Sequence, residues 1–186
     1  MRFTYPRFRL RTLLGLFVFA SVALAVYAAA WRSRERQYAI AVELAQLGIR
    51  ARAHDVTRWG LRPEIDYVEI DEHLGLKSNG LNWAVVPRPS EQRLTAGDVA
   101  RLAAFPALRK LHLQGDVVEP AAIAEIAGLA SLEELVIAHY PLDDEQLLQL
   151  GQLKHLRELT LEATAVTDGA IDQLREQLPE LQVYDD

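Results

Sequence analysis

The residues best suited to chemistry lie between positions 66 and 73 of this 186-residue chain, where carboxylates and an imidazole are crowded together. They are Asp66, Glu69, Asp71, Glu72 and His73. In an extended strand Glu69 and Asp71 share one face, and carboxylate oxygens are ligands that divalent cations prefer. One hypothesis is therefore a metal-dependent enzyme or a metal-binding protein that uses residues 66–73. We favour the other interpretation, a solvated acidic strand edge, and predict no metal site.

The sequence contains no other catalytic pattern. Its five histidines form no H-x-x-x-H or H-E-x-x-H pair, and neither Ser90 nor Ser131 lies in a G-x-S-x-G turn. The chain has no cysteine, which excludes a thiolate metal site, a disulfide and a cysteine nucleophile. Asp143, Asp144 and Glu145 are better explained as residues that cap a predicted helix. We predict a non-enzymatic protein without a cofactor.

The charges divide the chain into two different parts. The total is 26 acidic against 20 basic residues, a net charge of −6. Residues 1–36 contain 7 Arg and 1 Glu, which leaves 13 basic and 25 acidic residues in the rest of the chain. An acidic domain repels phosphate backbones, because affinity for nucleic acid comes mainly from Lys and Arg. We therefore expect no nucleic-acid partner.

Twenty residues without a charge, Thr12 to Trp31, follow a basic tail at residues 1–11. As a helix rising about 1.5 Å per residue, this run spans roughly 30 Å, the thickness of the hydrocarbon core of a bilayer. We predict a single transmembrane helix that contacts the lipid bilayer through residues 12–31. Four arginines precede the run and three follow it, which favours a cytoplasmic N-terminus and an extracytoplasmic domain.

Two other interpretations of the uncharged run stay open. Ala28-Ala29-Ala30 would serve as the cleavage site of a secretory signal peptide. The run would also fit a buried helix of a soluble core, although such a helix rarely carries arginines at both ends. We favour an uncleaved anchor, because residues 32–46 continue the helical pattern directly from the run.

Residues 32–63 are predicted to link the anchor to the domain. Apolar residues between Ala39 and Leu47 recur at helical spacing, and Gly48 follows where a helix often ends. Apolar and polar residues then alternate through residues 49–56, which is the period of a half-buried strand. We expect a helix followed by an edge strand that caps the domain.

The strongest pattern in the chain is a repeat of 24 residues. Seven apolar columns recur at this interval through three copies, which chance alignment does not explain. The columns are Val99, Ile123 and Leu147; Leu102, Ile126 and Leu150; Phe105, Leu129 and Leu153; Leu108, Leu132 and Leu156; Leu111, Leu135 and Leu159; Leu113, Ile137 and Leu161; and Val118, Leu142 and Val166. A last copy begins at Leu178. An earlier copy begins at Ile65, and an insertion at about residues 73–93 separates it from the rest.

The L-x-x-L-x-L segments resemble the leucine-rich repeats, in which each unit contains a short strand followed by a helix. Residues 156–174, LRELTLEATAVTDGAIDQL, resemble the bacterial variety with a T-x-V-T-D turn, and LPELQV at residues 178–183 resembles a usual last repeat. The basic start and single span resemble bacterial membrane-anchored proteins that carry such repeats. The resemblance implies an α/β fold, a short solenoid at residues 64–186 with parallel strands and helices on the convex side.

One position departs from the leucine-rich-repeat pattern. The place that holds Asn in many members is occupied here by Asp116, Tyr140 and Thr164. Asp and Thr can accept the hydrogen bonds that the turn offers at this place. Tyr140 cannot easily do so from an inward position, and Pro141 follows it. We therefore predict that the second turn is irregular.

In such a solenoid, residues that alternate with the buried ones lie on the exposed concave sheet. The candidates for partner binding on this face are Tyr67, Lys110, His112, Glu134, Val136, Ala138, Thr160, Glu162 and Tyr184. Tyr67 and Tyr184 are candidate aromatic anchors, and Val136 with Ala138 forms a small apolar spot. We predict that this face binds a protein or peptide. The alternative is a structural envelope protein that associates with its own copies.

A charged column with alternating sign, Arg109, Glu133 and Arg157, also follows the repeat. A charge-recognition stripe would explain it. We favour ion pairs between neighbouring repeats, each contributing only a few tenths of a kcal/mol because they are exposed.

Overall fold

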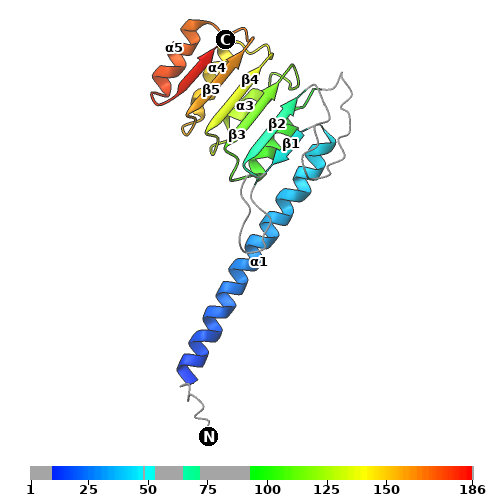
Figure 1. Ribbon diagram of the computed structural model, residues 1–186, viewed down its shortest axis with the longest axis vertical. Coiled ribbons are helices and arrows are strands. Elements are labelled where there is room, and N and C mark those ends of the chain that lie inside the picture. The colour runs from blue at the N-terminus through cyan, green and yellow to red at the C-terminus, as the bar shows by residue number, and fades with distance from the viewer. Residues whose placement is uncertain (1–9, 48, 53–64, 72–92, 186) are drawn as a thin grey trace, which may run out of the picture.

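The computed structural model describes residues 10–47, 49–52, 65–71 and 93–185, without the side chains of residues 10–16 and of Asp71. Figure 1 shows one long helix that leads into a sheet covered by short helices. The predicted basic tail at residues 1–11 and the predicted insertion at about residues 73–93 lie almost entirely outside the described residues.

Six strands form one sheet and follow one another in chain order. They are β1 (Ile49–Arg52), β2 (Tyr67–Asp71), β3 (Lys110–Gln114), β4 (Glu134–Ala138), β5 (Glu158–Glu162) and β6 (Gln182–Asp185). β1 runs antiparallel to β2, and every other neighbouring pair is parallel. Lys110 lies beside Glu134, which lies beside Glu158, so the 24-residue interval is the step from one strand to the next. The predicted α/β class and the parallel pairing are confirmed.

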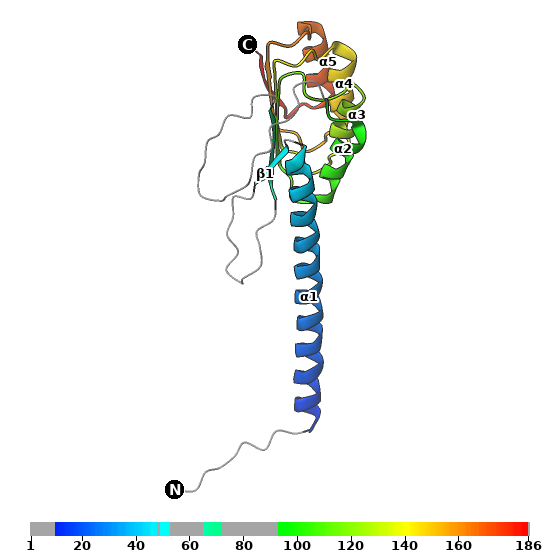
Figure 2. The same ribbon diagram turned by 90° about the vertical axis from the view of Figure 1, so that its right-hand side faces the viewer.

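The helices between the parallel strands lie on one side of the sheet (Figure 2). They are α2 (Ala96–Ala100), α3 (Ala122–Ala127), α4 (Asp144–Gln149) and α5 (Asp168–Gln177), with 3-10 turns η1 (Arg101–Ala104) and η2 (Leu150–Gln152). The side chains of Thr95, Asp143 and Thr167 each accept a hydrogen bond from a backbone N–H in the first helical turn. The capping role predicted for Asp143 is therefore confirmed.

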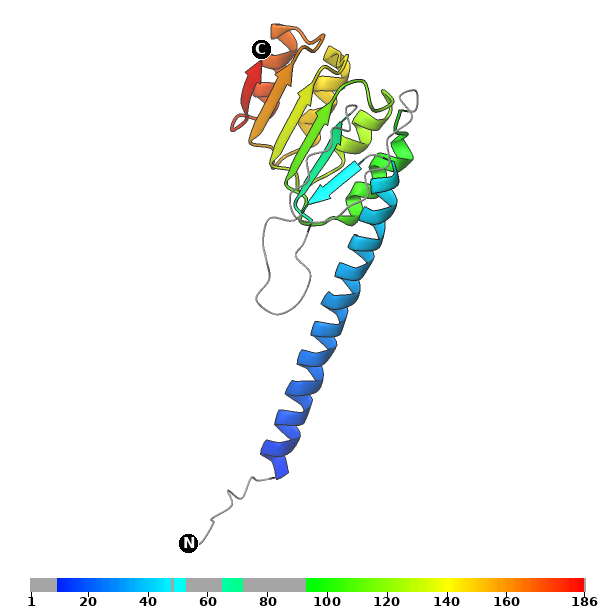
Figure 3. The same ribbon diagram turned by 45° about the vertical axis from the view of Figure 1, so that its right-hand side comes forward.

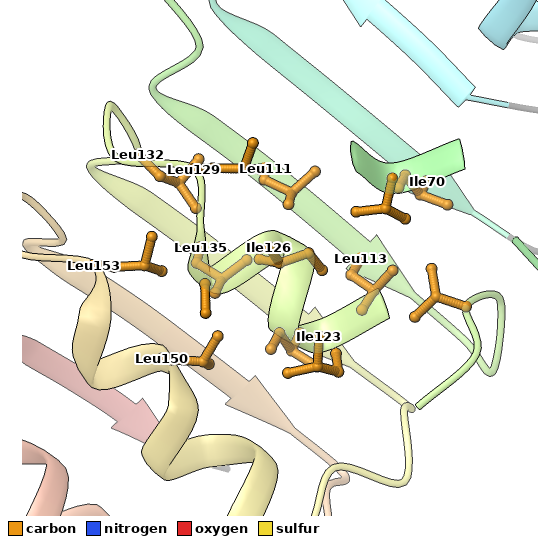
Figure 4. Packing of buried hydrophobic residues seen from close by; sticks show 14 of the residues in the cluster. Ile70, Leu111, Leu113, Ile123, Ile126, Leu129, Leu132, Leu135, Leu150 and Leu153 are labelled. Carbon is orange, nitrogen blue, oxygen red and sulfur yellow. The ribbon is translucent and has the colours of Figure 1, made fainter. Parts of the chain in front are cut away.

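The core lies between the sheet and these helices and is built from the seven repeating columns. Every member of the columns is buried except Val166, which is partly buried. Figure 4 shows Ile123 and Ile126 of α3 lying over the strands that carry Leu113 and Leu135. Full burial of one such side chain stabilises the fold by about 1.5 to 3 kcal/mol. No single repeat has enough apolar surface for this, so each unit depends on its neighbours.

The turns that follow β3, β4 and β5 share one backbone conformation. Gly115, His139 and Ala163, each 24 residues from the next, have φ values of 82°, 55° and 50°. The N–H of Gly115 donates to the carbonyl of Ala138 over 2.8 Å, and the N–H of His139 donates to that of Glu162 over 2.8 Å. The prediction of an irregular second turn is therefore wrong.

Tyr140 fits this regular turn because its ring becomes part of the core. Only 1% of its surface is exposed. Burial raises the pKa of its hydroxyl, and the neighbouring carboxylate of Asp116 raises it further. Packing of the aromatic ring thus takes the place of the hydrogen bonds that a small polar side chain would accept there.

The long helix α1 (Leu10–Gln46) contains 37 residues. Figure 3 shows most of its length projecting away from the sheet. Its last turns pack on the domain, where Ala41 and Leu44 are buried and Glu43 forms an ion pair with Arg101 of η1. No helix in the described part of the chain combines the length and the apolarity needed to cross a bilayer.

Candidate functional site

One face of the sheet, opposite the helices, presents polar side chains, and we call it the open sheet face. It arises because side chains alternate along a strand, so that the residues between the buried leucines point the other way. Its members are Arg50, Arg52, Tyr67, Glu69, Lys110, His112, Gln114, Glu134, Val136, Ala138, Glu158, Thr160, Glu162, Gln182 and Tyr184. All nine predicted partner-binding residues therefore lie on one surface.

The antiparallel strand β1 adds two arginines to this face. Arg50 and Arg52 contact the same oxygen of Glu69, over 3.5 Å and 3.3 Å. The guanidinium of Arg52 also lies 5.8 Å from the centre of the Tyr67 ring, within range of a cation–π interaction. Sequence reasoning did not include these arginines in the face. Their alternation with Ile49 and Ala51 was visible, but the strand that they would pair with was not.

A second group of contacts continues across β2, β3 and β4. The hydroxyl of Tyr67 lies 3.1 Å from Nδ1 of His112, and Nε2 of His112 lies 3.4 Å from Oε1 of Glu134. Lys110 also forms an ion pair with Glu134. A neutral His112 with its proton on Nε2 satisfies both contacts, since it donates to Glu134 and accepts from Tyr67. Because these four side chains contact one another, fewer of their polar groups are available to bind a partner.

The titration of these groups reflects the same contacts. Burial raises the pKa of the Glu134 carboxyl, but the hydrogen bonds from Lys110 and His112 and the charge interactions with both side chains together lower it more, so the pKa lies below its ordinary 4.5. The hydrogen bond to Glu134 raises the pKa of Lys110 above 10.5. Burial raises the pKa of Tyr67, and the charge of Glu69 raises it further. Near neutral pH the Lys110–Glu134 pair is therefore fully charged.

The β5 and β6 side of the open sheet face is more available. Glu158 and Glu162 are exposed and form no ion pair with any described residue. Tyr184 is 53% exposed, and its hydroxyl donates to Oε1 of Gln182 over 2.9 Å. Thr160 of β5 is half-buried, and its register partners are Val136 on β4 and Tyr184 on β6. Carboxylates and an accessible aromatic ring are therefore the main chemistry on this side.

The prediction that Ala138 contributes to an exposed apolar spot is wrong. Ala138 lies on the expected face of β4, but only 7% of its surface is exposed. Its register partners on the two sides are Gln114 and Glu162, whose long side chains flank a methyl group. Val136 is half-buried and remains the apolar residue that a partner could reach.

A shallow depression of about 380 Å³ lies where the parallel strands begin. Charged residues line it, namely Asp66, Arg109, Lys110, Glu133, Glu134, Arg157 and Glu158. Arg109 lies 3.8 Å from Glu133, which agrees with the predicted ion pair between repeats. Among the described residues Arg157 forms no corresponding pair with Glu133. Opposite charges alternate here, so the depression offers no concentrated field for a single charged ligand.

The structure describes only part of the acidic segment at residues 66–73. Glu69 contacts two arginines, while Glu72 and His73 lie outside the described residues. Within the described ranges no three or more His, Asp or Glu side chains are grouped so that they could hold a metal ion. The carboxylate of Glu69 forms ion pairs with Arg50 and Arg52 of β1 and is therefore not free to bind a metal ion.

The titratable groups of the open sheet face pair with one another or remain in contact with solvent, and the depression beside this face is shallow and mixed in charge. Set against known proteins, the sequence matches no protein-family model and no curated protein.

Proposed function

We propose that this chain is a leucine-rich-repeat protein, held at a membrane by residues 12–31, that binds a protein or peptide on its open sheet face. In this proposal the face is the concave side of a short solenoid. The repeat of 24 residues, the strand in each repeat and the helices on one side of the sheet support it.

One observation carries the binding proposal. Five parallel strands present a continuous row of side chains, and the part of the face on β5 and β6 has accessible groups that other described residues do not neutralise. Tyr184 is the most exposed aromatic ring of the sheet, and large aromatic residues often contribute most to interface energies. A peptide with basic side chains that meet Glu158 and Glu162, and an apolar group against Tyr184, fits this surface.

Affinity capture from native membranes tests the surface. The protein is solubilised in mild detergent, and proteins bound to the wild type are compared with those bound to Val136→Arg and Tyr184→Ala. Ala124→Arg is the matched control, because Ala124 is exposed on α3, on the opposite side of the sheet. We expect capture by the wild type and the control, and loss of the same protein with both face variants. Undiminished capture by the face variants would contradict the proposal.

Membrane anchoring is tested separately. An anchored chain stays in the membrane pellet after washing with alkaline carbonate, whereas a peripheral chain is released. The side of the membrane is tested with a single cysteine, since the chain has none of its own. Ala124→Cys should react with a membrane-impermeant maleimide added to intact cells if the domain is extracytoplasmic. Labelling only after the cells are broken would reverse the proposed orientation.

A further inference from the structure

A crevice lies between α1 and η1, where the long helix leaves the domain. Its volume is about 390 Å³, and it is lined by Ala29, Arg32, Ser33, Arg36, Gln37, Ile40 and Ala104. All but Ala104 come from one face of α1, because they are spaced by three or four residues. The same face continues into the core through Ala41 and Leu44, which are buried. The crevice therefore begins where this face stops packing on the domain and extends toward residue 31.

Gln37 lies deepest among the polar residues of this crevice. Only 3% of its surface is exposed, and its Oε1 atom has no hydrogen-bond partner among the described residues. An unsatisfied buried polar group is costly, and native proteins contain few of them. Turning the carboxamide about its last bond would place the Nε2 donor at this unsatisfied position beside the crevice. A ligand with acceptor oxygens would then satisfy this group.

Two cations lie at the mouth of the crevice. Arg32 and Arg36 are one helical turn apart, and like charges at this spacing repel each other. Nε of Arg32 donates to the carbonyl of Ala28 over 3.2 Å, which leaves its two terminal nitrogens for a ligand. Neither arginine forms an ion pair with a described residue. An anion between them would remove the repulsion and would also reach the hydroxyl of Ser33.

These groups match the chemistry of a phosphate. Guanidinium groups bind phosphate oxygens with two parallel hydrogen bonds, and hydroxyl and carboxamide donors add further contacts. The crevice also has apolar walls from Ala29, Ile40 and Ala104, which a free phosphate ion would leave without a partner. Its arginines directly follow the uncharged run at residues 12–31. In a protein anchored by that run, the crevice lies at the level of the lipid headgroups.

We propose that the crevice between α1 and η1 binds the phosphate of an anionic phospholipid, with Arg32 and Arg36 as its cations and Gln37 as a buried donor. This inference rests on the proposed membrane anchor and adds a specific lipid contact to it. The bound lipid would contact α1 and η1 together and so stabilise the angle at which the domain leaves the membrane.

Lipid titration of the full-length protein in neutral detergent micelles tests the proposal. The probes are short-chain phosphatidylglycerol, phosphatidylcholine of the same chain length, and inorganic phosphate. Native mass spectrometry counts the bound lipids, and calorimetry gives the affinity. We expect one phosphatidylglycerol per chain with saturable binding, and weaker binding of the other two probes. Equal affinity for inorganic phosphate would instead identify a site for soluble phosphates and would overturn the lipid assignment.

Single arginine variants distinguish lipid binding in the crevice from non-specific attraction of an anionic lipid to positive charge. Arg32→Gln and Arg36→Gln should each weaken binding of phosphatidylglycerol about tenfold or more, the loss expected for a charged hydrogen bond. Arg34→Gln removes the same charge from the same helix, but Arg34 does not line the crevice. It should change the affinity by less than about twofold, because Arg34 would not contact a lipid in the crevice and attraction over longer distances is screened by salt. Equal losses in all three variants would overturn the proposal.

Gln37→Leu distinguishes a ligand contact from a structural role. The substitution removes an unsatisfied buried oxygen, so the thermal stability of the lipid-free protein should stay the same or rise. Its affinity for phosphatidylglycerol should nevertheless fall about threefold or more, as expected for loss of one hydrogen bond. Unchanged affinity, or a parallel loss of stability and affinity, would contradict the assignment. If the carbonate wash shows an anchored protein that binds no lipid here, only this inference fails.

Discussion

Exchanging glycine and alanine between two equivalent turns should change the stability of the protein in opposite directions. Gly115 follows β3 with a φ of 82°, and Ala163 follows β5 with a φ of 50°. Both values lie in the left-handed region, where a side chain beyond glycine is disfavoured. Gly115→Ala places a Cβ in this conformation, and Ala163→Gly removes one. The first change should therefore destabilise the domain, and the second should stabilise it.

The expected size follows from two opposing effects. A residue with a Cβ in the left-handed region costs about 1 to 2 kcal/mol, and replacing glycine by alanine lowers the entropy of the unfolded chain by about 0.4 to 1 kcal/mol. Gly115→Ala should thus lower the free energy of unfolding by about 1 kcal/mol, and Ala163→Gly should raise it by about 0.5 to 1 kcal/mol. For a chain of this length, 1 kcal/mol shifts the midpoint temperature by about 2 to 4 °C.

Thermal unfolding of the full-length protein in neutral detergent, followed by far-ultraviolet circular dichroism, measures these shifts. Gly97→Ala is the matched control, because Gly97 lies within α2 and the added Cβ would come no closer than 3.7 Å to Oγ1 of Thr95. This control should be stabilising, since alanine is about 0.5 to 1 kcal/mol better than glycine in a helix. If Gly115→Ala were as stable as Gly97→Ala, the strain assigned to the turn would be refuted.

Three further predictions use the same unfolding measurement. Leu135→Ala should lower the free energy of unfolding by about 3 to 5 kcal/mol, because Leu135 is fully buried in a central strand, whereas Val136→Ala beside it should cost less than about 1.5 kcal/mol. Asp143→Ala should cost about 1 kcal/mol through loss of the N-cap of α4, and an unchanged midpoint would contradict that role. Glu134→Gln should cost about 0.2 to 1 kcal/mol at neutral pH by breaking the exposed pair with Lys110. Because the pKa of Glu134 lies below 4.5 in the folded protein, this cost should disappear as the pH falls well below that value, and a cost that persists there would contradict the pairing.

The repeat allowed the core and the parallel sheet to be predicted with little ambiguity. Leu111, Leu135 and Leu159 are buried because every unit repeats the same local pattern, and stacking identical units leaves one arrangement for their apolar faces. The same reasoning identified the rows of the open sheet face, since side chains alternate along every strand. It failed at Tyr140, where the pattern of small polar residues is broken but the backbone of the turn is retained.

Contacts between distant segments depended on the tertiary structure. Arg50 and Arg52 meet Glu69 only because β1 turns back antiparallel to β2, and a sequence pattern of period two does not specify the neighbouring strand. His112 joins Tyr67 to Glu134 only because three strands lie in one register. The composition of residues 1–36 and the 24-residue interval determine which surfaces are apolar. Gln37 is buried beside a crevice only because α1 packs next to η1, and the pattern of residues along one helix does not specify which element packs against it.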